Sequence, residues 1–252
     1  MFFSEFELRT KFITDPLREF PRLIQLSQKR LITIGYLNAH VLALLLVSRK
    51  FRQTFASLDY VYPDGWGGVL YLRLLGLSVE QRSSAPDFFF PLCDCLKENT
   101  PLFLLGGNKK AVRRLAEKIS VQVPQVQVVG TQGGYFRNDN LVVRKIIQAQ
   151  PDWILVGMGA DQFWQLPKQE QWVIKHLVQR IDRGLMWCVG DLFNQVFTER
   201  KSQSWYTEWW ERLKKQPKKM IARYIFDAIG FAIVMILVTI QLWKPRSTLE
   251  KN

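Results

Sequence analysis

The sequence is poor in the side chains that build metal sites and disulfide frameworks. Its 252 residues include three cysteines, Cys93, Cys95 and Cys188, and two histidines, His40 and His176. An odd number of cysteines with no CxxC pair argues against a disulfide scaffold and a zinc site, and favours a reducing cytosol. The histidines lie far apart and outside any HExxH pattern, so we expect no metal and read His40 as a packing or helix residue.

Two common nucleotide-binding patterns are also missing. Neither GxGxxG nor GxxxxGK[ST] occurs, so neither a dinucleotide-binding fingerprint nor a P-loop is supported, and no bound cofactor is predicted. The first 22 residues mix acids, bases and prolines without a continuous apolar stretch, and we therefore expect a protein that is not secreted.

Acidic residues are scarce relative to basic ones. The chain has 22 Asp and Glu against 35 Lys and Arg, a formal net charge of +13. Such a balance suggests an anionic partner, which is a nucleic acid, a lipid surface or a phosphorylated small molecule. Charge alone does not choose among them. No RNA- or DNA-binding motif accompanies it, so no nucleic acid is expected.

The pattern from residue 30 onward is an alternation of short apolar runs with amphipathic stretches. This rhythm is typical of βαβ units, which bury a largely parallel sheet between helices. Strands are predicted to begin near residues 30, 58, 101, 125, 151 and 184, and Asn38 is predicted to cap a helix over 39–51. The expected fold class is therefore α/β, Rossmann-like, with ligands at the carboxyl ends of the strands.

The character of the chain changes past residue 200. A run with six Lys or Arg and no acid after Glu211 leads into 224–243, an apolar stretch whose only charge is Asp227. As a helix of 20 residues this stretch would span about 30 Å, the thickness of a bilayer core. We predict a membrane-associated or transmembrane helix; the alternative is a buried C-terminal helix of the globular core. The basic run favours the membrane, because cations beside an apolar segment attract anionic headgroups.

These observations divide the chain into five segments. They are an N-terminal extension (1–29), an α/β domain (30–198), a basic, aromatic-rich appendage (199–223), the apolar helix (224–243) and a tail (244–252).

The stretch "VYPDGWGGV" (61–69) places Asp64 between proline and glycine at the end of a predicted strand. Asp-Gly is a common turn dipeptide, since glycine accepts positive φ and aspartate caps its own backbone. A carboxylate at a strand end can equally accept a proton from a substrate. By itself the stretch favours the turn.

Read in order, a set of short motifs resembles the WecG/TagA/CpsF family of bacterial glycosyltransferases over roughly residues 30–230. The motifs are "YLN" (36–38), "PDG" (63–65), "GLSVEQRSSAPD" (76–87), "LLGG" (104–107), "GGYF" (133–136), "PKQE" (167–170) and "TEWWERL…RY" (207–224). Each motif is weak alone, but their shared order is specific.

The resemblance implies an inverting enzyme that moves an N-acetylhexosamine-type sugar, such as N-acetylmannosamine, from a UDP-sugar to a polyprenyl-diphosphate-linked acceptor. It makes Asp64 the general base and Arg82 the cation that neutralises the leaving diphosphate. The substrate-binding positions it implies are Tyr36, Asn38, Asp87, Gly106, Gly107, Asn108, Gly134, Tyr135, Phe136, Gly159, Lys168, Gln169, Glu170 and Asn194. The positions assigned to the acceptor diphosphate and the membrane are Arg212, Lys215, Lys219 and Arg223.

Several alternatives stay open beside these roles. Arg82 can be a surface cation, Tyr135 and Phe136 core aromatics, and the basic run a generic headgroup contact. The whole chain can be a non-catalytic, membrane-bound binder of sugar nucleotides. The expected partners are a UDP-sugar, a lipid-linked sugar acceptor and membrane lipids at the cytoplasmic face of the bacterial plasma membrane, and the aromatic density leaves room for a homo-oligomer.

The sequence also departs from the family pattern at three places. Tyr36 replaces a threonine, Ala85 replaces a glycine, and Asn194 stands where aspartate is usual. A loop of extra residues precedes Pro167. These changes predict an altered sugar or acceptor specificity, while the presence of Asp64, Arg82 and Gln169 favours a working enzyme.

Overall fold

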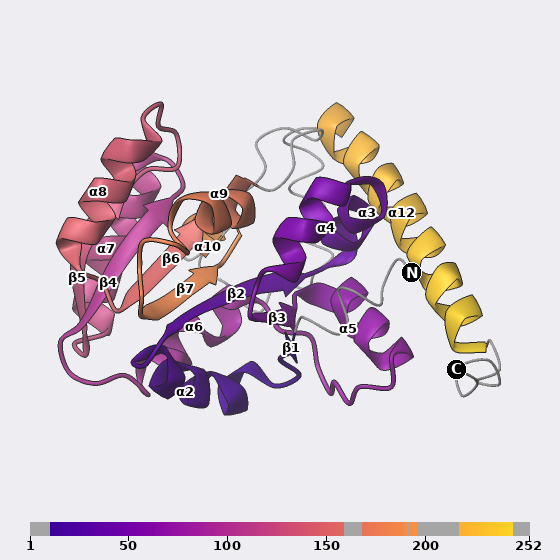
Figure 1. The fold of residues 1–252 in the computed structure, drawn as a ribbon, viewed down its shortest axis with the longest axis horizontal. Helices are drawn as coiled ribbons and strands as arrows, with labels where there is room; N and C mark the ends of the chain where they lie inside the picture. Colours follow the sequence, from indigo (N-terminus) through magenta and orange to yellow (C-terminus); the bar gives the residue numbers. More distant parts are fainter. Residues whose placement is uncertain (1–10, 159–167, 191, 196–216, 244–252) are drawn as a thin grey trace.

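The computed structural model describes residues 11–158, 168–190, 192–195 and 217–243 (Figure 1). Its centre is one sheet of seven parallel strands in the order β1-β3-β2-β7-β6-β4-β5. The strands are β1 (Lys11–Phe12), β2 (Leu31–Leu37), β3 (Tyr60–Pro63), β4 (Thr100–Gly106), β5 (Val126–Gln132), β6 (Trp153–Gly157) and β7 (Gly184–Cys188). The predicted α/β class and the six predicted strands are confirmed. The two-residue β1 was not predicted, since two residues show no periodicity.

Helices cover both faces of the sheet. They are α2 (Pro16–Ser27), α3 (Ala39–Val47), α4 (Arg49–Ala56), α5 (Gly65–Leu74), α6 (Ala85–Cys93), α7 (Lys109–Gln122), α8 (Asp139–Ala149), α9 (Lys168–His176), α10 (Leu192–Gln195) and α12 (Pro217–Trp243). One face packs against α2, α6, α7 and α10 around Trp153 and Trp187. The other face packs against α3, α4 and α5 at one end and against α8 and α9 at the other.

Side-chain caps fix where several helices begin. The Asn38 side chain accepts from the Val41 N–H and starts α3, and Asn108 does the same for α7 through Ala111. The helix predicted over 39–51 is instead two helices. Ser48 takes an extended conformation (φ −123°, ψ 108°), and its hydroxyl accepts from the Phe51 N–H to start α4. A serine competes with the helical backbone in this way, which explains the break.

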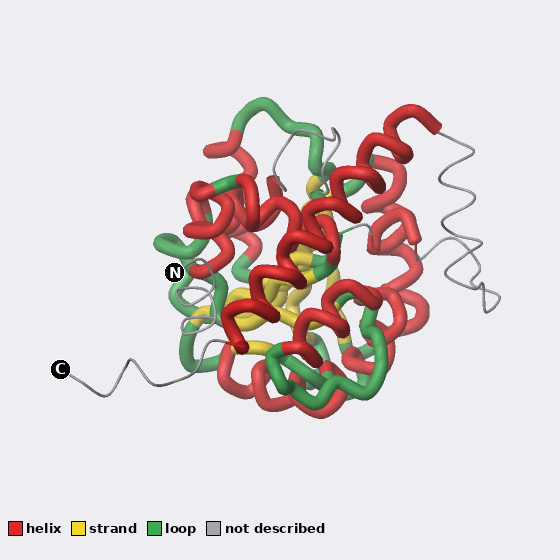
Figure 2. Tube along the Cα trace, turned by 90° about the vertical axis from the view of Figure 1, so that its right-hand side faces the viewer, coloured by secondary structure: helices red, strands yellow, loops and turns green. Residues whose placement is uncertain are grey.

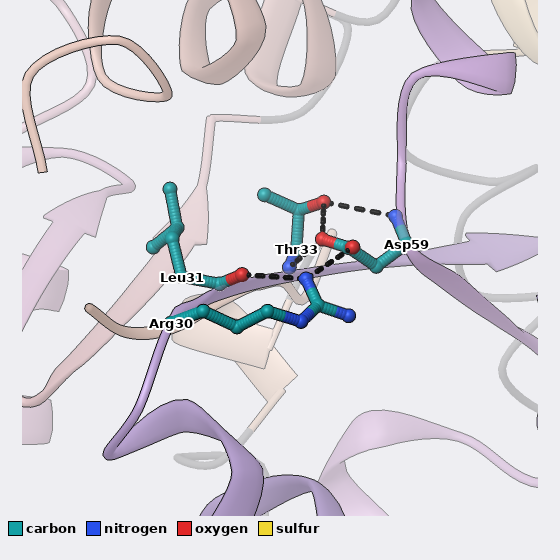
Figure 3. Close-up of polar contacts among 4 residues, drawn as sticks. All are labelled: Arg30, Leu31, Thr33 and Asp59. Carbon is teal, nitrogen blue, oxygen red and sulfur yellow. Dashed lines mark hydrogen bonds and ion pairs between the residues drawn. The ribbon is translucent and has the colours of Figure 1, made fainter. Parts of the chain in front are cut away.

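A polar cluster ties β2 to β3 at the amino edge of the sheet (Figure 3). Asp59 accepts from the backbone N–H and the hydroxyl of Thr33, both at 2.8 Å. The Arg30 guanidinium donates to Asp59 at 2.6 Å and to the Leu31 carbonyl at 2.9 Å. The cluster aligns the two strands, so that their carboxyl ends are paired at Leu37 and Pro63.

The C-terminal helix α12 is the outermost element on its side of the molecule. Figure 2 looks onto this side and shows the long helix lying across it, and α12 packs on α3 and α5. Val234 and Val238 are buried in the contact. By length and composition Ile221–Trp243 is able to cross a membrane. Only 17% of its most apolar window is buried inside the protein. The helix is therefore docked along one face and exposed along the other.

Candidate active site

The parallel strands bring their carboxyl ends to one edge of the sheet. After β4 the chain moves outward to β5, whereas after β6 it moves inward to β7. The neighbours β4 and β6 thus form a topological switch point, where α/β sheets open a crevice for ligands. The predicted site residues fall into two groups along this edge, one at β2, β3 and β7 and one at β4, β5 and β6.

Asp64 lies directly after β3, at the carboxyl edge. Its backbone N–H donates to the Leu37 carbonyl at 2.8 Å, and Gly65, with φ +77°, donates to the Ser83 carbonyl at 3.3 Å. The Asp64 side chain makes no capping bond to α5 and instead accepts from the Asn38 amide at 3.3 Å. A turn at this position explains the positive φ of Gly65. It does not explain why the Asp64 carboxylate faces Asn38 instead of capping α5.

The Asn38 amide has two contacts, and together they fix its orientation. The oxygen accepts from the Val41 N–H at 3.0 Å, which directs the NH₂ group to Asp64. The predicted cap of α3 is therefore also a support for the predicted base.

Tyr36 lies next to this pair, near the end of β2. Burial, together with the negative charges of Glu170 and Asp64, raises the pKa of Tyr36 well above its ordinary value. The positive charge of Arg223 on α12 acts in the opposite direction. The ring lies 6.4 Å from that of Tyr62, whose pKa is also raised by burial and then by Asp64. A neutral phenol is therefore present among two carboxyl groups and a guanidinium.

Gln169 and Glu170 form a buried polar pair in the first turn of α9. Both are fully buried, and the Gln169 amide donates to Glu170 Oε1 at 2.8 Å. Burial raises the pKa of Glu170 to about 7. Within the described part of the chain, Gln169 Oε1 and Glu170 Oε2 have no hydrogen-bond partner. Buried polar atoms without partners are costly, and they point to a ligand or a neighbour that completes them.

Arg82 and Asp87 precede and begin α6. Arg82 is partly buried and adjacent to Ser83, which forms a parallel bridge with Asp64. The backbone therefore places Arg82 beside the predicted base. Asp87 is exposed in the first turn of α6, and its N–H donates to the Ser84 carbonyl.

The second group of residues is a set of tightly packed glycines at the switch point. Gly106 (φ +149°) is paired with Gly157, and a Cβ on Gly106 would meet the Gly157 carbonyl oxygen at 2.3 Å. Gly107 takes φ +57°, and its carbonyl accepts from the Gly134 N–H at 2.8 Å. A Cβ on Gly157 would meet the Phe193 ring at 2.2 Å. Side chains are thus excluded here by packing, and backbone groups line the ends of β4 and β6.

The aromatic pair of the "GGYF" stretch divides between surface and core. Tyr135 is 67% exposed, whereas Phe136 packs edge-on against Trp172 at 5.5 Å. Phe136 thus has the contacts of a core aromatic. The Asn108 side chain is engaged in capping α7.

Some predicted residues cannot be placed as side chains. Gly159, Arg212 and Lys215 lie outside the described residues. Lys168, Asn194 and Lys219 lie on α9, α10 and α12, with only their backbone described. α9 begins at Lys168, as the preceding proline predicted.

Sequence reasoning missed four residues at or near the site. Cys188 is buried at the end of β7, and burial followed by the charge of Glu170 raises its pKa well above the ordinary value. Gly157 ends β6 and Gly190 follows β7, each in a visible Val-Gly dipeptide, which was a usable signal. His40 pairs with Asp227 across 187 residues, and no local pattern reveals such a pair.

Among the described residues, no group of three or more His, Cys, Asp or Glu side chains is placed to hold a metal ion.

The fold defines an α/β protein whose polar and glycine-rich strand ends meet at a topological switch point, the place where such sheets bind ligands. The chain belongs to the glycosyl transferase WecG/TagA/CpsF family, whose model matches residues 12–247. It is therefore an enzyme of the glycosyltransferase class.

Three similar curated proteins share one name. The chain is 27% identical over 210 residues, 78% of each chain, to an N-acetylglucosaminyldiphosphoundecaprenol N-acetyl-beta-D-mannosaminyltransferase of Bacillus subtilis. Proteins of that name from Bacillus spizizenii (26% over 128 residues; 50% of this chain, 48% of the relative) and Staphylococcus aureus (26% over 173 residues; 67% and 64%) are also similar.

Proposed function

We propose that this glycosyltransferase moves an N-acetylhexosamine-type sugar, such as N-acetylmannosamine, from a UDP-sugar to a sugar linked through diphosphate to a polyprenol. The relatives' name supplies the lipid-linked acceptor and the transferred sugar. The observation on which the proposal rests is the Asp64 carboxylate. It lies at the carboxyl edge, does not cap its own helix, and is oriented by Asn38.

In the proposed reaction Asp64 acts as the general base. It takes the proton of the acceptor hydroxyl, whose oxygen then forms a bond to the anomeric carbon from the face opposite the UDP. The bond between that carbon and the UDP oxygen breaks, its electron pair leaves with UDP, and the configuration inverts. A carboxylate within hydrogen-bond reach of the hydroxyl contributes roughly 10²- to 10⁴-fold in this role.

The donor is proposed to lie at the switch point, with the diphosphate against the glycine-walled ends of β4 and β6. The glycines let the ends of β4 and β6 pack against each other and against Phe193, which leaves backbone groups at the switch point. Gln169 Oε1 and Glu170 Oε2, which have no hydrogen-bond partner among the described residues, are proposed to complete polar contacts to the donor. Arg82, next to the bridge at Asp64, would neutralise the charge that develops on UDP, and no metal is invoked for this step.

The acceptor is proposed to approach from the side of α12. Its diphosphate lies at a membrane surface, and Arg223 projects from α12 close enough to Tyr36 to influence its ionisation. The exposed face of α12 has Ile225, Ile229 and Ile233 at helical spacing, with exposed fractions of 54%, 57% and 40%. This face is proposed to rest on the cytoplasmic leaflet, with the helix lying in the interface and not spanning the bilayer, because its opposite face is docked on α3.

The test is a transfer assay with UDP-N-acetylmannosamine and a short-chain polyprenyl-diphosphate-linked N-acetylglucosamine. Asp64→Asn is expected to lower kcat by about a hundredfold or more while the thermal midpoint stays within a few degrees, because the side chain caps no helix. Asp94→Asn, an exposed acid at the end of α6, is the matched control and should retain wild-type kcat. EDTA is expected to leave the wild-type rate unchanged. Donor binding without turnover by the wild type would instead support a non-catalytic binder.

A further inference from the structure

A hydrogen bond between two largely buried side chains connects α12 to the start of α3. His40 Nδ1 lies 2.6 Å from Asp227 Oδ1, and the two side chains are only 8% and 13% exposed. His40 is the second residue of α3, directly after the Asn38 cap that contacts Asp64. The pair therefore ties α12 to the backbone turn that supports the predicted base.

The same carboxylate also faces an arginine one helical turn earlier. Asp227 Oδ2 lies 3.5 Å from Arg223 Nε, in an i, i+4 arrangement on α12. Asp227 thus faces His40 with one oxygen and Arg223 with the other. Arg223 Nε makes no hydrogen bond to Asp227 at this distance, so the pairing is electrostatic. The end of the guanidinium, where its two NH₂ groups lie side by side, has the donor spacing to bind a second anion.

Close packing sets the depth of the helix at the next turn. A Cβ on Gly230 would lie 2.4 Å from the Ala43 Cβ and 2.9 Å from its Cα, so α12 and α3 approach closely at this point. Asp227 and Gly230 are three residues apart and so lie on the same face of α12. Two contacts on this face therefore fix the position of α12 on α3: the polar contact of Asp227 with His40 and the close packing of Gly230 on Ala43.

We propose that His40 and Asp227 are positioning residues that hold Arg223 at the edge of the active site, where its guanidinium binds the diphosphate of the lipid-linked acceptor. This inference rests on the proposed function, since it assumes that the acceptor diphosphate reaches Arg223. It assigns neither His40 nor Asp227 to contact with substrate. Their effect is transmitted through the orientation of Arg223.

The first test compares the acceptor and donor constants of Asp227→Asn, His40→Gln and Arg223→Ala. Each substitution is expected to reduce kcat/KM for the lipid-linked acceptor on the order of tenfold or more, with the KM for the UDP-sugar nearly unchanged. The Asp227→Asn/Arg223→Ala double variant should be no worse than Arg223→Ala alone, because both changes remove the same contact. Arg223→Lys, which keeps the charge without the fork, should restore activity only in part.

A matched control separates this role from simple stabilisation. Asp59→Asn breaks the Arg30–Asp59 pair at the opposite edge of the sheet. It is expected to lower the thermal midpoint while leaving the acceptor KM unchanged. If the acceptor constants of Asp227→Asn and His40→Gln do not change, or if the double variant shows additive losses, the positioning role is wrong.

A binding measurement keeps the inference apart from the proposed function. Calorimetric titration with farnesyl diphosphate, a short isoprenoid diphosphate, requires no turnover. Its Kd is expected to rise on the order of tenfold in both Arg223→Ala and Asp227→Asn. A wild type that binds farnesyl diphosphate in this way but transfers no sugar would contradict the proposed function alone. Transfer by the wild type, with equal Kd values in all variants, would contradict the positioning role alone.

Discussion

Asn38 shows how one side chain can serve both fold and chemistry. Its oxygen caps α3 and its NH₂ group contacts the Asp64 carboxylate at 3.3 Å. The capping bond removes the rotational freedom of the amide, so the contact to Asp64 requires little further ordering. The sequence predicted the cap from position alone, but the contact to Asp64 depends on pairing between β2 and β3, which only the fold supplies.

Glu170 offers a residue-scale prediction from its ionisation. Burial raises its pKa from the usual 4.5 to about 7, so between those values the folded protein binds more protons than the unfolded one. The free energy of unfolding therefore falls as the pH rises from about 4.5 to about 7, and the full penalty, roughly 3 kcal/mol, is present above pH 7. Below pH 4.5 the carboxyl group is neutral in both states and contributes no such penalty.

Glu170→Gln removes this penalty without changing the size of the side chain. The variant is expected to be more stable than the wild type at pH 8 by a few kcal/mol, and nearly equal to it at pH 4.5, by urea denaturation at each pH. Glu98→Gln, at an exposed site, should show no such pH-dependent difference. An equal difference at both pH values would show that ionisation of Glu170 is not the cause.

At the scale of elements, the strands were predictable and the docking of α12 was not. Short apolar runs identified β2, β3, β4, β6 and β7, because burial on both faces leaves few polar positions within them. β5 is mostly only partly buried, and it contains two glutamines and a threonine. The split between α3 and α4 depends on the conformation of Ser48, a local choice that periodicity does not reveal. The contact of α12 with α3 joins residues nearly 190 positions apart, such as His40 and Asp227.

The substitution Gly230→Ala tests how closely α12 packs on α3. Helix propensity alone predicts that Gly230→Ala stabilises α12 by about 1 kcal/mol. The approach to Ala43 predicts the opposite, since the new Cβ would meet the Ala43 Cβ at 2.4 Å and overpacking costs about 1–3 kcal/mol. We therefore expect faster hydrogen exchange along α12 and α3 in Gly230→Ala, measured by mass spectrometry.

The companion variants separate the two effects on α12. Adding Ala43→Gly to Gly230→Ala should restore much of the protection, because it removes the atom that clashes. Ala232→Gly, at an exposed position of the same helix, reports the propensity term alone. Slower exchange in Gly230→Ala than in the wild type would mean that the two helices do not approach as closely as described.

At the scale of the whole molecule, the sequence predicted a basic, apolar C-terminal appendage to an α/β domain, with a membrane-associated or transmembrane helix, but it left the contact between helix and domain open. The single helix α12 spans the predicted boundary at 223/224 and has two unlike faces. Asp227, Gly230, Val234 and Val238 face α3 and its neighbours, and the isoleucines of the outer face are exposed. Mean hydropathy averages the residues of both faces. It therefore could not distinguish a helix that spans a membrane from one that packs on the protein.

The outer face of α12 leads to the last prediction, on membrane binding. Replacing Ile225, Ile229 and Ile233 together by glutamine is expected to weaken binding to anionic vesicles by at least about tenfold, since each isoleucine loses a favourable apolar contact with lipid. The Gln substitutions keep helix propensity and leave the face toward α3 unchanged. Sedimentation with phosphatidylglycerol vesicles measures the loss. Activity on a water-soluble short-chain acceptor should be retained, while activity on a long-chain acceptor in vesicles falls with binding.

The control replaces three exposed apolar residues away from α12 by glutamine: Val121, Leu141 and Ile147. In both sets the exposed fractions range from about two-fifths upward. They lie on or beside α7 and α8, at the opposite end of the sheet from α12 (Figure 1). Their loss should leave vesicle binding unchanged. Raising the salt should weaken binding of the wild type further, since a net charge of +13 attracts anionic headgroups and salt screens that attraction. Equal losses in the two triple variants would show that the outer face of α12 is not the surface that meets the membrane, because general surface hydrophobicity would then account for the binding.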